Sequence, residues 1–444
     1  MKRALETLLI RWKDENHPLP LLLRGARQVG KSFLATEFGK KYFQSLAVID
    51  FEQRPEYKNI FSSKDPKEII LKMEFALKQR IIPGETLIFL DEIQECPEAL
   101  LSLRYFKEQM PNQHIIAAGS LLEFLLNDES FSFPVGRVEF LYLRPFSFIE
   151  FLEAVDPFLL SYLDEYSLHR TPDEIQHKTF LNLVRRYLFI GGMPDAIKSS
   201  ITEQFLLDCA KVQNRLLQSY ESDFGKYASH SKHRLLNLIF QKAPSLVAQN
   251  LKYSRLDPDT RSRELKPALN LLFHTGLLKP CYFTSASGIP LHAYIKDDKF
   301  KLYFLDVGLL QAATHIDPTA LLQQEIIQIN SGMIAEQFVA QELIAYDNPT
   351  INPYLVFWET EKGGQAEVDF VISYKNHIIP IEVKSGSTGS LRSLKSFLSQ
   401  KKSPLGIRIS EHNLSFHDGV LSVPFYLIKM IPKFINEALQ NNLN

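Results

Sequence analysis

The chain has 444 residues, of which 45% are hydrophobic and 23% charged, and its formal net charge is −1. This length predicts roughly two to four domains with real hydrophobic cores. Because positive and negative charges nearly cancel over the chain, an acidic partner must bind a local basic patch. The three cysteines lack CxxC spacing and no apolar run has transmembrane length, which argues against a zinc site, a disulfide framework and a membrane span and predicts a cytoplasmic protein.

Alternating strand-like and helix-like stretches fill residues 1–150. This order predicts a parallel sheet flanked by helices, the arrangement of an α/β domain. The last expected strand precedes Arg144-Pro145, where the proline breaks the element. The expected strands are Pro20–Leu23, Leu46–Phe51, Leu87–Leu90, His114–Ala118 and Val138–Leu143.

The segment GARQVGKS, residues 25–32, fits the P-loop pattern of a glycine, four residues and then Gly-Lys-Ser. It follows the apolar stretch PLLL and precedes a helical stretch, so the strand–loop–helix context is met. The glycines let backbone N–H groups point at phosphate oxygens, Lys31 reaches the β and γ phosphates, and the Ser32 hydroxyl ligates Mg²⁺. The pattern therefore predicts a site for ATP and Mg²⁺, with a chance glycine turn as the minor alternative. Its residues are Gly25, Ala26, Arg27, Gln28, Val29, Gly30, Lys31, Ser32 and the following Phe33.

The stretch LIFLDEIQ ends an apolar strand in Asp91 and Glu92. In P-loop enzymes such a strand lies beside the P-loop strand, so we expect both carboxylates at the same sheet edge. Asp91 would then hold the magnesium ion, and Glu92 would orient or deprotonate the attacking water. A solvated strand end is the plainer alternative, but the P-loop earlier in the chain favours the catalytic interpretation.

Two further residues are candidates for contacts with the γ-phosphate. Ser120 follows the strand-like stretch IIAA and would sense the phosphate, although a helix N-cap explains it equally well. Arg137, in PVGRVEF, would supply positive charge from the same chain or from a neighbouring subunit, and a plain surface arginine is the commoner case. A role from a neighbouring subunit requires a homo-oligomer, which the sequence leaves open.

Residues 151–225 have helical periodicity with few strand signals and are expected to form a helical lid. In residues 226–320, helical runs lead into two strand-like segments, LLKPCYF and LHAYIK, an order that suggests a winged helix. Residues 225–267 hold nine Lys and Arg against three acidic residues. Phosphate contacts need such cations on one face, so nucleic acid, DNA in the first place, is the expected partner, with a solvated surface as the alternative.

Residues 321–444 open with a helical stretch and continue with strands, among them EVDFVISYKNHIIPIEVK. If this hairpin turns at Lys375-Asn376 without a bulge, Asp369 faces Glu382. Lys384 then shares the face of Glu382, because strand side chains alternate. Like charges that face each other across a ladder are unfavourable unless a cation binds between them. The spacing therefore predicts a divalent cation site.

Several motifs together resemble a large family of prokaryotic AAA-type ATPases whose C-terminal half is a domain of unknown function related to restriction endonucleases. The resemblance spans nearly the whole chain. It implies an α/β fold with a P-loop parallel sheet, a helical lid, a winged-helix segment and a C-terminal α/β domain similar to restriction endonucleases. The motifs are GARQVGKS, LIFLDEIQ, AAGSLLEFL, PVGRVEFLYLRPFSFIEFL, GGMPDAI and KLYFLDVGLL, the last with Val307 where the family usually has threonine.

The hairpin itself resembles the PD-(D/E)XK nucleases, which place an Asp on one strand and Glu-x-Lys on the next. That resemblance implies that Asp369 and Glu382 hold Mg²⁺ while Lys384 orients the attacking water. A glutamate on a preceding helix often completes the set, and Glu336 in GMIAEQFVAQEL is placed for this role.

Three alternatives to a cleaving site stay open. They are a plain hairpin with charged ends, a nuclease fold kept only for DNA binding or dimerisation, and a bulge at Pro380 that moves Glu382 away. The leading hypothesis is an Mg²⁺-dependent ATPase coupled to a DNA-binding half in which Asp369, Glu382 and Lys384 are the candidates for cleavage. Its rival is a nucleotide-gated switch whose nuclease-like domain is inactive and only clamps DNA or a protein.

Overall fold

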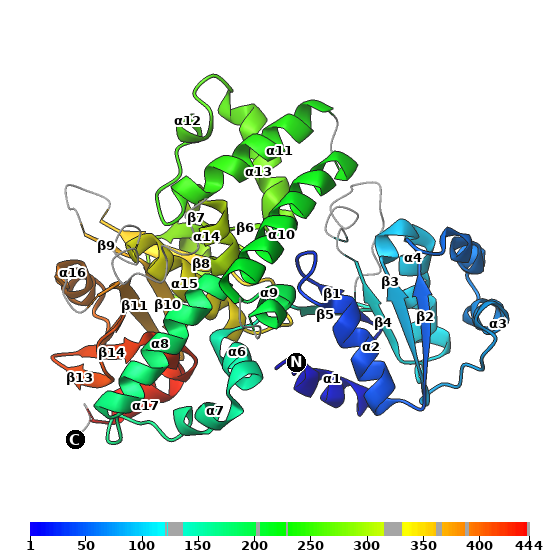
Figure 1. Cartoon of the computed structure of the whole chain (residues 1–444), viewed down its shortest axis with the longest axis horizontal. Coiled ribbons are helices and arrows are strands. Elements are labelled where there is room, and N and C mark those ends of the chain that lie inside the picture. Colours follow the sequence, from blue (N-terminus) through cyan, green and yellow to red (C-terminus); the bar gives the residue numbers. More distant parts are fainter. Residues whose placement is uncertain are drawn as a thin grey trace. The chain divides into compact units, whose positions relative to one another are not determined.

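The structure is a computed structural model that describes residues 1–119, 122, 136–200, 205–227, 230–314, 331–360, 366–386 and 390–441. Ser120, the candidate phosphate sensor, lies outside these residues. The chain divides into two compact units, whose ribbons are drawn in Figure 1. The N-terminal unit comprises Met1–Arg144, His274–Gly276 and Asn348–Asn352. The C-terminal unit comprises Pro145–Phe273, Leu277–Asp347 and Pro353–Asn444.

A five-stranded parallel sheet forms the centre of the N-terminal unit, with the strand order β2-β3-β4-β1-β5. The strands expected from the sequence all form, and every neighbouring pair is parallel. The α/β sheet predicted for residues 1–150 is therefore confirmed. The strands are β1 (Leu21–Arg24), β2 (Ser45–Asp50), β3 (Thr86–Asp91), β4 (Ile115–Ala118) and β5 (Glu139–Tyr142).

Helices cover both faces of this sheet (Figure 1). They are α1 (Glu6–Lys13), α2 (Lys31–Tyr42), α3 (Pro66–Leu77) and α4 (Pro97–Gln109). Residues of α3 and α4 share one buried core with the strand residues Leu22, Ile88 and Leu90. Because side chains alternate along a strand, the buried Leu21 and Leu23 point to the other face, where α2 packs. The P-loop therefore begins from a strand that is buried on both sides.

β3 does not pair with the P-loop strand β1, because β4 lies between them. The expectation that these two strands are neighbours is therefore wrong. The order of the strands across a sheet depends on pairing between segments that are distant in the chain. The position of a strand in the sequence therefore does not reveal its neighbours in the sheet. Since all three strands are parallel, the residues that follow β1, β3 and β4 still emerge at the same edge of the sheet.

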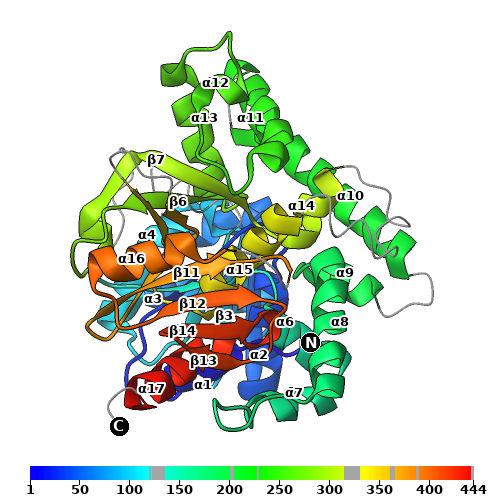
Figure 2. The same ribbon diagram turned by 90° about the vertical axis from the view of Figure 1, so that its left-hand side faces the viewer.

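The C-terminal unit begins with helices, as expected for residues 151–225. In both views α11 and α13 lie side by side (Figures 1 and 2). None of the helices in the described part of the chain is long and apolar enough to cross a membrane. The first helices are α6 (Phe148–Val155), α7 (Pro157–Leu163), α8 (Glu174–Ile190), α9 (Pro194–Ser199), α10 (Phe205–Tyr227), α11 (His230–Lys242), α12 (Tyr253–Leu256) and α13 (Ser262–His274).

Two sheets follow in the C-terminal unit. One has four strands in the order β7-β6-β8-β9, and the other has five in the order β10-β11-β12-β14-β13. The helices of this part are α14 (Val307–Ala313), α15 (Ser331–Tyr346), α16 (Arg392–Lys401) and α17 (Ile431–Asn441). The strands are β6 (Leu278–Thr284), β7 (Ile295–Phe304), β8 (Leu355–Glu359), β9 (Glu367–Val368), β10 (Phe370–Tyr374), β11 (His377–Val383), β12 (Gly406–Ser410), β13 (Ser415–His417) and β14 (Val420–Pro424).

The first segment expected to form a wing, LLKPCYF, lies in β6 apart from its first leucine. The second, LHAYIK, is expected to be a strand, but Leu291–Tyr294 forms a short 3-10 helix and only Ile295 and Lys296 belong to β7. The strands in this region are thus β6 and β7. They pair in an antiparallel sense, but β6 also pairs with β8, so both belong to the four-stranded sheet and do not form a free ribbon. The domain boundary expected near residue 320 falls between strands of this one sheet. Local periodicity does not report pairing with a strand that follows much later in the chain.

A buried polar network ties the motifs GGMP and LDVGLL together. The carboxylate of Asp306 is fully buried and accepts a hydrogen bond from Gly192 N at 2.5 Å. It also accepts from Leu309 N at 3.0 Å and from Gln341 Nε2 at 3.2 Å. A Cβ atom on Gly192 would lie 2.2 Å from Phe146 O, so the close approach requires glycine. These motifs therefore hold the segment after α8 and the helices α14 and α15 around one carboxylate.

Glu342, also fully buried, makes the stability of this unit depend on pH. Both of its oxygens accept from Phe148 N, at 3.0 and 3.2 Å, and Tyr346 donates its hydroxyl to one of them. Burial raises the pKa of Glu342 from 4.5 to about 8, and the charge of Glu150 adds to the rise. The folded state thus holds the proton more tightly than the unfolded state. The stability that comes from this group is complete below about pH 4.5 and is lost as the pH rises through about 8.

We therefore expect Glu342→Gln to flatten the fall in stability on the alkaline side. Between about pH 5.5 and about pH 8, the free energy of unfolding of the wild type should fall relative to the variant by up to about 1.4 kcal/mol per pH unit. Urea unfolding at a series of pH values measures this difference. Parallel pH profiles for the two proteins would show that Glu342 titrates normally.

Candidate nucleotide site and C-terminal carboxylate cluster

The P-loop connects the end of β1 to the first turn of α2. Gly25 has φ +139°, and a Cβ atom there would lie 2.1 Å from Leu143 O, so the loop can pass the segment after β5 only with glycine. Gly30 has φ +96° and directly precedes α2. The first N–H groups of a helix have no intrahelical partner and attract anions, so this end of α2 suits a phosphate.

An N-terminal arginine fixes the loop. Arg3 is buried and donates to Val29 O at 3.2 Å and to Arg144 O at 2.5 Å, which links the P-loop to the segment that follows β5. No local pattern in the sequence marks Arg3 for this role, because both partners are distant in the chain. Of the other loop residues, Ala26 is buried, Arg27 and Gly30 are half-buried, Gln28 and Ser32 are exposed, and Phe33 is 52% exposed.

The ammonium group of Lys31 is held over the loop. Its Nζ donates to Gly25 O and to Ala26 O, both at 2.9 Å, and the residue is only 7% exposed. Lysines of P-loops meet the β and γ phosphates from this position. The structure therefore places Lys31 where the sequence pattern predicts it.

The two residues predicted to ligate magnesium lie at the same edge of the sheet, with Ser32 in the first turn of α2 and Asp91 at the end of β3, and the Ser32 hydroxyl acts to lower the pKa of the Asp91 carboxyl. Burial raises the pKa of Asp91 to about 6, against the effect of this hydroxyl, and the charges of Glu92 and Asp50 add to the rise. A hydroxyl and a carboxylate oxygen are ligands that Mg²⁺ prefers, and Mg²⁺ completes its shell with water and phosphate oxygens. The residues present therefore fit a magnesium ion, whose charge would favour the ionised form of Asp91 against the effect of burial.

Glu92 follows β3 in a left-handed conformation, with φ +48°. Strained residues of this kind cluster at active sites. The Oε2 atom of Glu92 accepts from Gln94 Nε2 at 2.7 Å. The other amide atom, Gln94 Oε1, is buried, and it lies 2.1 Å from the place that a Cβ atom on Gly119 would take. Gln94, to which the sequence assigned no role, thus positions Glu92 against the end of β4.

Arg137 lies far from the P-loop of its own chain. It directly precedes β5, where Glu139 is the partner of Leu21, and β5 runs parallel to β1. Arg137 is therefore at the amino edge of the sheet, whereas the P-loop leaves the carboxyl edge. Its guanidinium pairs with Glu108 at 3.2 Å. The length of β5 thus separates Arg137 from the P-loop of its own chain.

In the C-terminal unit the hairpin has the register expected from the sequence. Residues 370–374 pair with residues 377–381, and Pro380 causes no bulge. Asp369 stands directly before this ladder, where the chain leaves β9 and passes from the four-stranded to the five-stranded sheet. Its Oδ2 atom accepts from Val383 N at 2.8 Å. Asp369 therefore lies beside the end of β11, as predicted, but at a bend and not within a strand.

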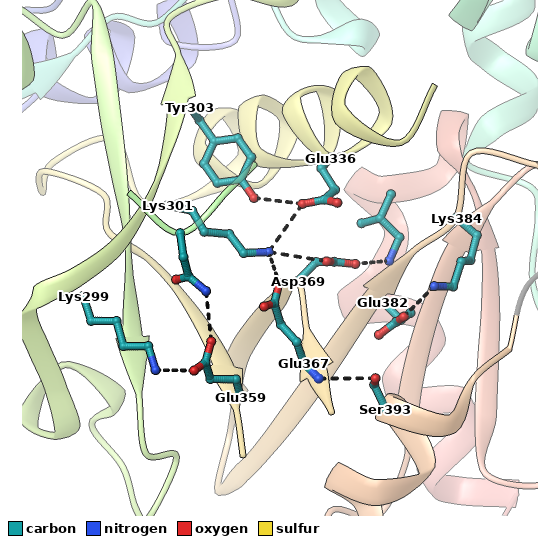
Figure 3. Close-up of polar contacts among 12 residues, drawn as sticks. Lys299, Lys301, Tyr303, Glu336, Glu359, Glu367, Asp369, Glu382, Lys384 and Ser393 are labelled. Carbon is teal, nitrogen blue, oxygen red and sulfur yellow. Dashed lines mark hydrogen bonds and ion pairs between the residues drawn. The ribbon is translucent and has the colours of Figure 1, made fainter. Parts of the chain in front are cut away.

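A buried lysine occupies the space among the carboxylates (Figure 3). Lys301, on β7, has a side chain that is only 2% exposed, and its Nζ lies 2.5 Å from Glu367 Oε1. Glu336 Oε2 and Asp369 Oδ1 lie 3.6 and 3.7 Å from the same nitrogen. Tyr303, two residues along β7, donates its hydroxyl to Glu336 at 3.3 Å. The predicted ligands Glu336 and Asp369 thus come together around an ammonium group.

The other two predicted residues form a pair beside this group. Glu382 is 5% exposed, and its Oε1 accepts from Lys384 Nζ at 2.6 Å. Its Oε2 is buried and has no hydrogen-bond partner in the described part of the chain. Burial, followed by the charge of Asp369, raises the pKa of Glu382 to about 7. Lys384 shares the site with Glu382, as the alternation along a strand predicted.

The electrostatics of the cluster keep Lys301 charged. Burial by itself lowers the pKa of Lys301, but the charges of Glu336, Asp369 and Glu367 outweigh it and hold that pKa above its ordinary value. Burial raises the pKa of Glu336 to about 8, and the charge of Asp369 adds to the rise. Burial also raises the pKa of Asp369. The cluster therefore contains more carboxyl groups than lysines, and the raised pKa values favour the protonated form of some of these carboxyl groups.

The predicted set Asp369, Glu382 and Glu336 does not fit a divalent cation in this arrangement. Within the residues that the structure describes, no three or more His, Cys, Asp or Glu side chains are arranged to hold a metal ion. The physical reason is the ammonium of Lys301, which takes the space between Glu336 and Asp369. One feature of the sequence could have indicated this role of Lys301. It is the charged residue in an otherwise apolar run at 300–305, which is buried in the structure.

Residues 17–152 match the family model described as an AAA domain. Residues 181–320 and 331–428 match two models, each described as a domain of unknown function (DUF8612 and DUF4143). With the P-loop, Ser32 and Asp91 at one edge of a parallel sheet, the N-terminal unit contains an AAA-type P-loop ATPase domain. The two further models give no function to the C-terminal unit.

No significant match was found among the curated proteins. Among solved structures, a Walker-type ATPase of Pyrococcus abyssi (PABY2304) is 18% identical, with a TM-score of 0.45 over 70% of this chain and 95% of that one. The ADP form of the Aeropyrum pernix ORC2 protein is 13% identical, with a TM-score of 0.31 over 76% of this chain and 93% of that one. Cdc6p of Pyrobaculum aerophilum is 13% identical, with a TM-score of 0.24 over 72% and 92%.

Proposed function

We propose that this chain is an Mg²⁺-dependent ATPase whose nucleotide state controls a nucleic-acid-binding C-terminal half. The observation that carries the ATPase part is Lys31, held over the P-loop by Gly25 O and Ala26 O, at the sheet edge where Ser32 and Asp91 also lie. Magnesium bound there would neutralise phosphate charge. Lys31 would bind the β and γ phosphates, and Glu92, held by Gln94, would orient or deprotonate the attacking water.

Phosphate release from ATP by the full chain tests this proposal. Release that requires both ATP and Mg²⁺ supports it, and a folded chain that releases no phosphate overturns it. If Arg137 contributes to turnover, it does so in a neighbouring copy, so a homo-oligomer is part of the proposal. Turnover per chain that rises with protein concentration and falls on Arg137→Ala would support that part.

Exposed cations support nucleic acid as the partner. Between residues 230 and 274, all the Lys and Arg side chains are exposed, namely Lys232, Arg234, Lys242, Lys252, Arg255, Arg261, Arg263 and Lys266. They lie on or between α11, α12 and α13. Cations on mobile side chains bind phosphates regardless of sequence, which would give a salt-dependent affinity.

Changing Arg261, Arg263 and Lys266 together to alanine is expected to weaken DNA binding by at least about tenfold near 0.1 M salt. The slope of log affinity against log salt should shrink by up to about 3, because each lost phosphate contact contributes about 0.9. Fluorescence anisotropy with a labelled duplex at several salt concentrations measures both quantities. Lys40, Lys67 and Arg80, exposed in the N-terminal unit, changed together serve as the matched control. Equal losses in the two triple variants would argue against this surface.

The carboxylate cluster bears on whether bound nucleic acid is also cut. Of the two hypotheses, the position of Lys301 among Glu336, Glu367 and Asp369 favours a unit that binds without cutting. Plasmid DNA incubated with the full chain and Mg²⁺ or Mn²⁺, with and without ATP, separates them. Cutting by the wild type that Asp369→Ala abolishes would overturn the non-cleaving hypothesis.

A further inference from the structure

Lys301 brings a permanent positive charge to the point where carboxylates from three elements converge. Glu336 comes from α15, Glu367 from β9 and Asp369 from the bend that follows β9. The lysine reaches them from β7, with its Nζ 2.5 Å from Glu367 and within 3.7 Å of the other two (Figure 3). The side chains of Lys301, Glu336 and Asp369 are 2%, 19% and 13% exposed, so water screens their charges only weakly, whereas Glu367 at 38% is open to water.

Carboxylates that lie this close together inside a protein need a cation between them. Desolvation of a single carboxylate costs several kcal/mol, and facing carboxylates repel each other more strongly inside a protein than in water. A divalent cation would answer the same need, but it has to lie about 2.0 to 2.6 Å from its oxygen ligands. The Lys301 ammonium already fills the space between those oxygens, and two cations in one desolvated place would repel each other.

Backbone and side-chain donors hold the oxygens on the other side of the cluster. Asp369 Oδ2 accepts from Val383 N at 2.8 Å, and Glu382 Oε1 accepts from Lys384 Nζ at 2.6 Å. In the described residues of the cluster, Glu382 Oε2 is the buried carboxylate oxygen without a partner. A single protein oxygen holds a divalent cation only weakly, because water would have to supply the other ligands.

We infer that Lys301 is the built-in cation of this cluster and that its ammonium takes the place of a divalent cation at Asp369. Lys301, Glu336, Glu367 and Asp369 then form a structural charge cluster that joins the two sheets of the C-terminal unit. This inference goes beyond the proposed function and does not depend on ATP hydrolysis. It predicts that removing the ammonium creates a metal site from residues already present.

The test uses the full chain without nucleotide and counts bound Mn²⁺ by the electron paramagnetic resonance of free Mn²⁺. The wild type and Asp369→Asn should bind equal amounts of Mn²⁺. Lys301→Met, which keeps most of the side-chain length without its charge, should bind one Mn²⁺ more per chain than the wild type. Its unfolding midpoint should rise by about 5 °C at Mn²⁺ concentrations about a hundredfold above Kd. Both gains should disappear in the double variant Lys301→Met/Asp369→Asn.

Lys299→Met is the matched control. Lys299 lies two residues earlier on β7 and pairs with Glu359, outside the cluster (Figure 3). Its replacement should leave Mn²⁺ binding at the wild-type level. Wild-type Mn²⁺ binding that Asp369→Asn abolishes would overturn the inference, and so would a folded Lys301→Met that binds no additional Mn²⁺. Should Lys301→Met fail to fold, the comparison of the wild type with Asp369→Asn decides alone.

Discussion

Replacing Lys31 by alanine is expected to lower kcat for ATP by at least about 10²-fold, with little change in the stability of the fold. The ammonium lies over the P-loop and donates to Gly25 O and Ala26 O, the position from which it would meet the γ-phosphate. Charge aimed at the transferring phosphoryl group contributes roughly 3 to 4 kcal/mol when it is positioned in advance. Steady-state phosphate release and the thermal unfolding midpoint are the two measurements.

Lys40→Ala is the matched control for this experiment. Lys40 lies on the same helix, α2, and its side chain is 63% exposed and pairs with Glu37. Its removal should change neither turnover nor stability. Phosphate release that is equal in wild type, Lys40→Ala and Lys31→Ala would show that the P-loop does not carry the reaction.

A second prediction concerns the stability of the C-terminal unit. Asp306→Ala is expected to lower the free energy of unfolding of the C-terminal unit by roughly 3 to 5 kcal/mol. The variant leaves three buried donors, Gly192 N, Leu309 N and Gln341 Nε2, without their acceptor. Each unsatisfied buried donor costs about 1 to 3 kcal/mol. Asp298→Ala, at an exposed position of β7, should stay within about 0.5 kcal/mol of the wild type.

The two tryptophans allow each unit to be followed by itself. Trp12 belongs to the N-terminal unit and Trp358 to the C-terminal unit, and the sequence contains no other tryptophan. In a Trp12→Phe background, urea unfolding followed by tryptophan fluorescence reports on the C-terminal unit through Trp358, which is buried against Phe397. Equal unfolding midpoints for Asp306→Ala and Asp298→Ala would mean that the Asp306 network does not stabilise the unit.

The features that could be predicted from the sequence are those that depend on residues close together in the chain. The P-loop depends on a glycine pattern over eight residues, and its conformation follows from residues 25–32 themselves. The strands of the first sheet are short apolar runs between turn signals, and all five were found within one or two residues of their ends. The hairpin register follows from the turn at Lys375-Asn376, because a two-residue connection between antiparallel strands determines which residues face each other.

Local spacing was therefore enough to predict the α/β sheet, the loop that positions Lys31 and Ser32, and the approach of Asp369 to Glu382. Three other features became known only from the folded chain: β4 separates β3 from β1, Arg3 fixes the P-loop, and Lys301 enters the carboxylate cluster. The first group depends on neighbours in the chain, whose spacing the sequence displays directly. The second group depends on side chains that meet across large sequence separations. Packing brings them together, and in the C-terminal cluster it supplies an ammonium where local spacing alone predicted a metal ion.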